Sequence, residues 1–214
     1  MTTFDLSVTD ELLSTTRAVR KRLDMDRPVE RSAILDCIAL SQQAPTGSNR
    51  QGWRWVVVTD ADKRKTLGEL YRRGVGGYLA TAKAQAEERG AAQDARVFAS
   101  AQYLADRMQD VPVHVVPCIE AGHIPADAPR RAWIGLGGSI FPAVWSFQLA
   151  LRARGLGSCL TTLHLAYEKE AAELLGIPES VVQIALLPVA YTLGADFKPA
   201  KRPPVDGIVH WDSW

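Results

Sequence analysis

The chain has 214 residues, of which 47% are hydrophobic and 23% are charged, and its formal net charge is +1. This length suits one sizeable domain, so residues 1–214 are expected to form a single unit. The near-neutral charge excludes a general polyanion-binding surface and argues against nucleic acid as a partner. Widely spaced cysteines, and the lack of an evident secretory leader or membrane-spanning stretch, together predict a cytoplasmic protein.

Hydrophobic periodicity and helix-breaking residues indicate a chain rich in helices. Asp60 is expected to cap one of these helices, and Gly155-Leu156-Gly157 is interpreted as the end of another. The pattern predicts helices over 10–16, 30–44, 61–71, 78–109 with a break near Gly90, 133–154 and 166–175.

Three apolar runs predict buried strands, because valine-rich segments suit a pleated surface: 55–59, 111–119 and 181–190. Strands separated by long helices indicate an α+β or α/β fold. The segment 120–130 is interpreted as a loop within the domain. Two tryptophans among the last four residues would be poorly covered on a monomer, which favours docking of the tail against a partner subunit.

The common catalytic motifs are incomplete in this sequence. The stretches GVGGYL, GLGGSI and GLGSCL lack the full G-x-G-x-x-G register and the Walker lysine, so a Rossmann dinucleotide site is not predicted. Four scattered histidines do not support a metal site. Cys159 and His164 suggest either a thiol nucleophile with its base or a buried structural cysteine, and the second interpretation is favoured.

Three polar or basic segments remain. In the first, Arg17 and Arg20 are three residues apart, and on one turn of helix they would point the same way and grip a phosphate. The third, KPAKRPP, carries Lys198, Lys201 and Arg202. A solvated basic turn and a solvated tail are the alternatives for these two segments.

The second segment, QQAPTGSNRQGWRW at 42–55, is unusually rich in hydrogen-bonding groups for a connection between two core elements. Its small residues would let the backbone approach a flat ligand, and its amides could pair with ring edges or hydroxyls. A turn that caps neighbouring elements is the alternative. One ligand with a phosphate, a polyol stem and a flat heteroaromatic ring, as in flavin mononucleotide (FMN), would use all three segments.

The sequence resembles the nitroreductase family of flavin enzymes over nearly its whole length. Four stretches in the same order carry the resemblance: TRAVRKRLDMDRPVER, APTGSNRQGWRWVVV, FPAVWSFQLALRARGLGSCLTTLH and LGADFKPAKRPPVDGIVHW. The resemblance implies an α+β, three-layer α-β-α fold with a mixed or antiparallel central sheet. It also implies an interlocked homodimer with two FMN sites at its interface.

The resemblance further implies which residues contact FMN. Arg17, Arg20, Lys201 and Arg202 would hold the phosphate and ribityl chain. The neighbouring subunit would supply the wall formed by Thr46, Gly47 and Asn49, with Gln51 assisting. Along the ring would lie Leu160, Thr161, Thr162 and Leu163, with a backbone N–H near Thr162 facing the flavin N5. Ala18 stands where a flavin-contacting serine is frequent, and Gly52 where a proline is frequent.

The implied activity is reduction of nitroaromatics, quinones or related small-molecule acceptors with NADH or NADPH. Donor and acceptor would use the same flavin face in turn, and no side-chain acid or base would be required. A reductive dehalogenase or flavin-fragmenting relative is one alternative, with any substrate lid expected in the region 74–101. A non-catalytic flavin-binding or sensor protein, and a dimeric interaction module without flavin, are the others.

Overall fold

The computed structural model, which describes residues 4–125 and 127–214, contains a five-stranded antiparallel sheet within those residues. Its central strand, β2 (Val113–Glu120), pairs with β1 (Trp53–Val58) on one side. On the other side it pairs with β5 (Leu187–Tyr191) and, further along, with β4 (Val181–Gln183). β3 (Leu156–Ser158) adds to the far side of β5. The sheet is thus built around β2.

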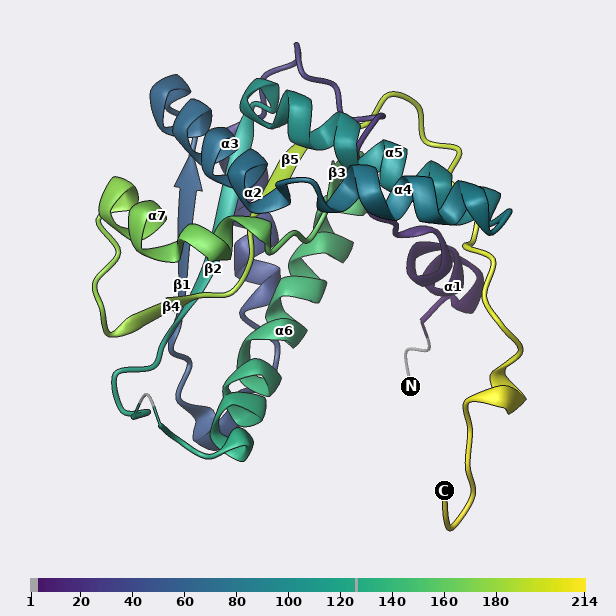
Figure 1. Ribbon diagram of the computed structural model, residues 1–214. Coiled ribbons are helices and arrows are strands. Elements are labelled where there is room, and N and C mark those ends of the chain that lie inside the picture. Colours follow the sequence, from purple (N-terminus) through teal and green to yellow (C-terminus); the bar gives the residue numbers. More distant parts are fainter. Residues whose placement is uncertain (1–3, 126) are drawn as a thin grey trace.

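Helices cover both faces of this sheet and produce three layers (Figure 1). Alternate residues of β2 point to opposite faces, so Val116 and Cys118 join one apolar cluster while Val113 and Val115 join the other. α3 (Ala61–Val75), α5 (Ala92–Arg107) and α7 (Glu168–Leu175) belong to the first cluster. α2 (Arg31–Ser41) and α6 (Arg130–Arg152) belong to the second. The α+β class and the antiparallel sheet predicted above are confirmed.

The remaining helices lie beside this three-layered body. α4 (Tyr78–Glu88) and α5 form a hairpin in which the rings of Tyr78 and Phe98 meet edge to face. Gly90 separates them with a φ of +67°, which confirms the predicted break. The Asp60 side chain accepts from the Lys63 N–H and so caps α3 as expected.

The N-terminal helix α1 (Leu6–Thr15) ends before the basic segment. The prediction that Arg17 and Arg20 share one helical turn is therefore wrong. Arg17 to Val19 leave the helix because Ala18 forms a parallel bridge with Ser158, and the Val19 N–H donates to the Ser158 carbonyl over 2.9 Å. Arg20 then begins a turn in which its carbonyl accepts from the Leu23 N–H. Pairing with the sheet edge replaces the helical hydrogen bonds here.

One strand prediction and one helix-end prediction also need correction. The run 181–190 is not one strand but two, β4 and β5, because Leu186 leaves the β2 ladder and pairs with Thr161. The second error concerns Gly155-Leu156-Gly157. Gly155, at φ +72°, follows the end of α6 as expected, yet Leu156 and Gly157 already belong to β3.

The long helix α6 meets the length and composition of a membrane span, contrary to the expectation from sequence, although 44% of its most apolar window is buried inside the fold. Its inner face, including Ile140 and Phe147, packs against β2 and β5 in the second apolar cluster. Trp133, Ile134, Phe141 and Trp145 are exposed on the same helix. One face of α6 therefore packs in the hydrophobic core, and the other is an apolar surface that is exposed in the single chain.

Two histidines are enclosed in the fold. His114 lies in β2 and His164 in η3 (Leu163–Tyr167), and both are fully buried. Burial lowers the pKa of each to about 4, although His114 Nε2 donates to the Met108 carbonyl over 2.8 Å. Because the charged ring would lose its hydration, the folded protein holds both side chains neutral.

We expect these histidines to make the protein less stable in mild acid. The unfolded chain binds protons near pH 6.5, so stability is retained above that value and is lost as the pH falls toward 4. The loss should reach roughly 3 kcal/mol for each histidine. Urea unfolding across this range measures it. The double variant His114→Gln, His164→Gln should flatten the dependence, whereas His123→Gln, at an exposed site, should leave it unchanged; an unaltered slope in the double variant would contradict the assignment.

Candidate functional site

A basic cavity of 380 Å³ lies between the N-terminal segment, α5 and the C-terminal segment. Arg17, Arg20 and Lys201, which were predicted to hold phosphate, all line it, and Arg96 of α5 joins them. None of the described residues that line this cavity is acidic. Arg202 does not line it. The arrangement is a cluster of cations suited to an anionic group.

Backbone contacts fix the position of this cluster. The Arg17 guanidinium donates to the Lys198 carbonyl over 2.8 Å, which ties the N-terminal segment to the C-terminal one. Ala18, predicted as a cofactor contact, also lines the cavity and pairs with Ser158 at the end of β3. The cluster is consequently anchored to the sheet.

The neighbouring cysteine is a structural residue. Cys159 is buried, and burial raises the pKa of its thiol against the opposing effect of the Arg20 guanidinium. The pKa of Tyr71, which lies close to this pair, is raised to about 12, mainly by burial. Neither ring nitrogen of His164 has a hydrogen-bond partner in the described part of the chain. A protonated thiol without a paired base favours the structural interpretation of Cys159.

The loop after β3 carries the next four predicted residues, Leu160, Thr161, Thr162 and Leu163. Thr161 is buried, and both its N–H and its hydroxyl donate to the Leu186 carbonyl, over 3.1 and 2.7 Å. Thr162 is exposed, and its backbone N–H has no acceptor within residues 4–125 and 127–214. Leu160 is also exposed, whereas Leu163 packs on the first apolar cluster. The loop is therefore held by Thr161 and presents a free donor at Thr162.

A close contact with α3 fixes the other end of this loop. A Cβ added at Gly74 would lie 2.0 Å from the Leu163 carbonyl oxygen, which no side chain can tolerate. Gly74 has ordinary helical geometry, so the requirement is for space and not for an unusual φ. Glycine lets the helix and the loop meet backbone to backbone.

The second predicted wall, around residues 46–52, is attached to the first half of α6 through Ser139. The Gly47 N–H donates to the Ser139 hydroxyl over 3.0 Å, and the Trp53 indole N–H donates to the Ser139 carbonyl over 2.7 Å. Within the loop, the Gln51 side-chain amide donates to Asn49 Oδ1 over 2.8 Å. These bonds support both interpretations of the segment, a capped turn and a shaped wall.

The backbone of this loop is strained. Ser48, Asn49 and Gln51 have φ values of 53°, 52° and 51°, in the left-handed region that residues other than glycine seldom adopt. Each such residue costs on the order of 1 kcal/mol. Strain of this kind persists where the surrounding structure demands one shape, and it concentrates at binding sites.

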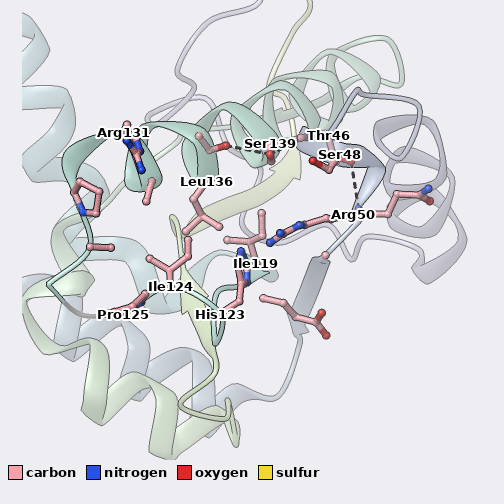
Figure 2. Close-up of a pocket in the computed structure, with 18 residues that line it drawn as sticks. Thr46, Ser48, Arg50, Ile119, His123, Ile124, Pro125, Arg131, Leu136 and Ser139 are labelled. Carbon is pink, nitrogen blue, oxygen red and sulfur yellow. Dashed lines mark hydrogen bonds between the residues drawn. The ribbon is translucent and has the colours of Figure 1, made fainter.

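A larger cavity of 410 Å³ opens between this loop, the end of β2 and the start of α6 (Figure 2). Thr46, Gly47 and Gln51 line it, whereas Asn49 does not. Three basic residues that the sequence analysis passed over, Arg50, His123 and Arg131, also line it. No spacing signalled them, because they come from three separate segments.

The predicted residues therefore form two groups in one chain. Ser139 holds the 46–52 loop, whereas Arg152 reaches the N-terminal and C-terminal segments through Thr15 and the Ala195 carbonyl. Arg152 lies thirteen positions after Ser139 along the helix, which corresponds to roughly 20 Å. Among the described residues, the two cavities share no lining residue. A single chain does not bring both groups to one place.

Arg96 was also missed, because an arginine on a predicted helix gives no sign that the helix will lie over a basic cluster. The region 74–101, considered above for a substrate lid, is the end of α3 followed by most of the α4–α5 hairpin. Its α5 residues line the basic cavity.

In the described residues, no group of three or more His, Cys, Asp and Glu side chains is placed to hold a metal ion.

Comparison with known proteins identifies the family. The model of the nitroreductase family matches residues 13–191, so the chain belongs to the nitroreductase family. A search of curated proteins finds no match.

Solved structures share the fold at low identity. A BluB-like flavoprotein from Clostridium difficile 630 is 19% identical with a TM-score of 0.70, covering 99% of this chain and 100% of that one. An iodotyrosine deiodinase bound to FMN and 3-iodo-L-tyrosine is 21% identical with a TM-score of 0.68, covering 96% and 99%. The FMN- and NADPH-dependent nitroreductase NfnB from sphigopyxis sp. strain HMH is 21% identical with a TM-score of 0.67, covering 96% and 99%.

The contact at Gly74 generates a test of how the Thr162 loop is held. Gly74→Ala should force α3 and the loop apart and lower the free energy of unfolding by about 1–3 kcal/mol. Gly77→Ala is the matched control, since a Cβ there meets nothing within 4 Å. Urea unfolding of both variants measures the difference. Equal stability of the two variants would show that the close approach is not required.

Proposed function

We propose that this protein is an oxidoreductase that binds FMN and uses NADH or NADPH to reduce nitroaromatics, quinones or related acceptors. The observation that carries the proposal is the basic cavity of Arg17, Arg20 and Lys201, whose lining residue Ala18 pairs with Ser158 at the end of β3. The loop with the free Thr162 N–H leaves the sheet from this same strand. The chemistry of these donors suits FMN: cations for its phosphate and a backbone N–H for its ring. FMN-bound and FMN-dependent proteins among the fold neighbours support the cofactor.

The roles of the protein residues follow from their positions. Arg17, Arg20 and Lys201 bind the phosphate, Arg96 adds to the same charge, and Arg202 lies further along the same segment. Thr161 fixes the loop through Leu186, so that the Thr162 N–H is held ready for the flavin N5 edge. When bound, FMN supplies hydride acceptance and release at N5. The protein supplies orientation and charge.

A second copy of the chain completes each site in this proposal. Thr46, Gly47, Asn49 and Gln51 are separated from the basic cavity by much of the length of α6, so another subunit would bring them to the flavin. The exposed side chains of Trp133, Ile134, Phe141 and Trp145 on α6 form an apolar surface suited to such a partner. Trp211 and Trp214 are exposed as well. They belong to the C-terminal segment, which extends away from the sheet (Figure 1). These features favour an interlocked homodimer.

A specialised activity is the second candidate. Two fold neighbours are described as an iodotyrosine deiodinase and a BluB-like flavoprotein. The α4–α5 hairpin occupies the region where such a relative would carry a lid. Its α5 residues, however, line the basic cavity that we assign to phosphate. This contact favours a role for the hairpin in holding the cofactor, and general acceptor reduction is therefore preferred.

The visible absorption spectrum of the purified protein tests the function. We expect flavin bands that bleach on anaerobic addition of NADH or NADPH and return when a nitroaromatic or quinone is added. Bands that persist with both donors would indicate a flavin-binding protein without this activity. A colourless protein that does not take up added FMN would overturn the proposal.

The phosphate role of the basic cavity is tested by comparing FMN with riboflavin, which lacks the phosphate. The unmodified protein should bind FMN more tightly, and the double variant Arg17→Gln, Lys201→Gln should weaken FMN binding by about 10- to 100-fold while changing riboflavin binding little. Fluorescence quenching on titration measures both affinities. Lys21→Gln is the control, because Lys21 does not line this cavity. Equal weakening of both ligands would show that the arginine and lysine do not read the phosphate.

A further inference from the structure

The 410 Å³ cavity beside the 46–52 loop has the composition of a binding site for an apolar molecule with a negative charge. Its walls are largely apolar and include Ile119, Ile124 and Leu136. Into this apolar setting the chain places Arg50, His123 and Arg131. Figure 2 shows the Arg50 and His123 side chains extending into the cavity from different walls. Apolar walls with a few convergent polar groups are typical of small-molecule sites.

The positive charge of this cavity has no internal partner. Arg50 and Arg131 take part in no ion pair within residues 4–125 and 127–214. Glu120, the one acidic residue among the described residues that line the cavity, is paired with Arg54 instead. Both arginines are exposed to solvent, so their guanidinium groups are free to exchange water for a ligand carboxylate, which each can bind through two parallel hydrogen bonds.

The N-terminal end of α6 adds to the positive electrostatic potential of the cavity. This helix has 23 residues and begins at Arg130 without a side-chain cap, and its first turns form one side of the cavity. The unsatisfied N–H groups and the positive end of the helix dipole therefore face the same region as the two arginines. The dipole adds to a charge cluster that already exists and does not define the site by itself.

The cavity adjoins the wall that we assign to the flavin. Thr46, Gly47 and Gln51 belong to both. A molecule in this cavity would lie next to the flavin contacts of the same loop, where an acceptor must lie to receive electrons. The proposal below rests on the proposed function for this reason.

We propose that this cavity binds the anionic group of an aromatic acceptor, and that Arg50 and Arg131 make the enzyme prefer carboxylated acceptors over neutral ones. The apolar walls accommodate the ring, and Arg50 and Arg131, on different sides of the cavity (Figure 2), each offer a guanidinium to the carboxylate. The phosphates of the dinucleotide donor carry the same kind of charge, so the experiment separates the acceptor from the donor.

The test compares 4-nitrobenzoate with its neutral methyl ester. In the unmodified protein we expect the carboxylate to reoxidise the reduced enzyme with a second-order rate constant about tenfold or more above that of the ester. The double variant Arg50→Gln, Arg131→Gln should lose this preference through a lower rate for 4-nitrobenzoate only. Calorimetric titration of the oxidised protein with benzoate and with benzamide gives a second readout that needs no turnover: only benzoate binding should weaken.

Controls distinguish the other outcomes. Arg89→Gln, at the exposed end of α4, removes one positive charge away from the cavity and should leave the preference intact. Slower reduction by NADPH in the double variant, with unchanged reoxidation by 4-nitrobenzoate, would assign the arginines to the donor and overturn the proposal. Loss of bound FMN would assign them to the cofactor and overturn it equally. Equal effects on the carboxylate and the ester would exclude charge recognition.

Failure of the proposed function has a different signature. An unmodified protein that binds no flavin, or turns over neither acceptor, contradicts the oxidoreductase assignment itself. Calorimetry still decides the present proposal in that case. Tighter binding of benzoate than of benzamide that depends on Arg50 and Arg131 would support the anion site, and equal binding of the two would overturn it.

Discussion

The fold depends on β2, which is buried on both faces over seven of its eight residues. A strand in this position must pair on both sides, and it does so with β1 from His114 to Ile119 and with β4 and β5 on the other edge. It must also carry apolar side chains on both faces, and Val113, Val115, Val116 and Cys118 provide them. His114 is the exception, and it stays neutral because no water reaches its ring. The sheet around β2 also positions both candidate walls of the site. The 46–52 loop leads into β1, which pairs with β2, and the basic segment at Ala18 pairs with β3, which reaches β2 through β5.

The two walls are set by opposite parts of the structure. The 46–52 loop leads directly into β1 and is tied to the first half of α6 through Ser139. The basic segment around Ala18 pairs with β3 at the other edge of the sheet, near the end of α6. Because both are anchored to rigid elements, they cannot approach each other within one chain. The strained backbone at Ser48, Asn49 and Gln51 therefore shapes a surface that is remote from the basic cavity of its own chain.

Much of the fold could be predicted from the sequence, because the signals are local. Helical periodicity, the Asp60 cap and the break at Gly90 depend on neighbouring residues alone. The predictions of secondary structure were wrong where pairing with a residue far away in the sequence determines the backbone conformation. The run 181–190 is apolar throughout and gives no sign that Leu186 will pair with Thr161. Arg17 and Arg20 follow a helix in sequence, yet the pairing of Ala18 with Ser158 keeps them out of it.

In the candidate site, too, residues that are close in sequence could be predicted, whereas residues brought together by packing could not. Arg17, Arg20 and Lys201 could be singled out because they form short basic clusters in the sequence, and the structure brings them to one cavity. Arg96 could not be, since only the packing of α5 places it there. Arg50 and Arg131 are 81 positions apart and gain their common setting from the end of β2 and the start of α6. Residues that act together across elements leave no periodic or spaced pattern.

The apolar outer face of α6 connects these observations. Four large side chains, Trp133, Ile134, Phe141 and Trp145, are between 40% and 61% exposed on this helix, and exposed apolar area of that kind is costly in water. The same helix holds the 46–52 loop through Ser139 and forms a wall of the larger cavity. A partner that covers this face would also be placed beside the loop. In the proposed dimer, burial of this apolar face would supply the free energy that joins the two chains. The same contact would bring each 46–52 loop to the other chain's basic cavity. Dimer assembly and cofactor binding would therefore depend on the same surface of α6.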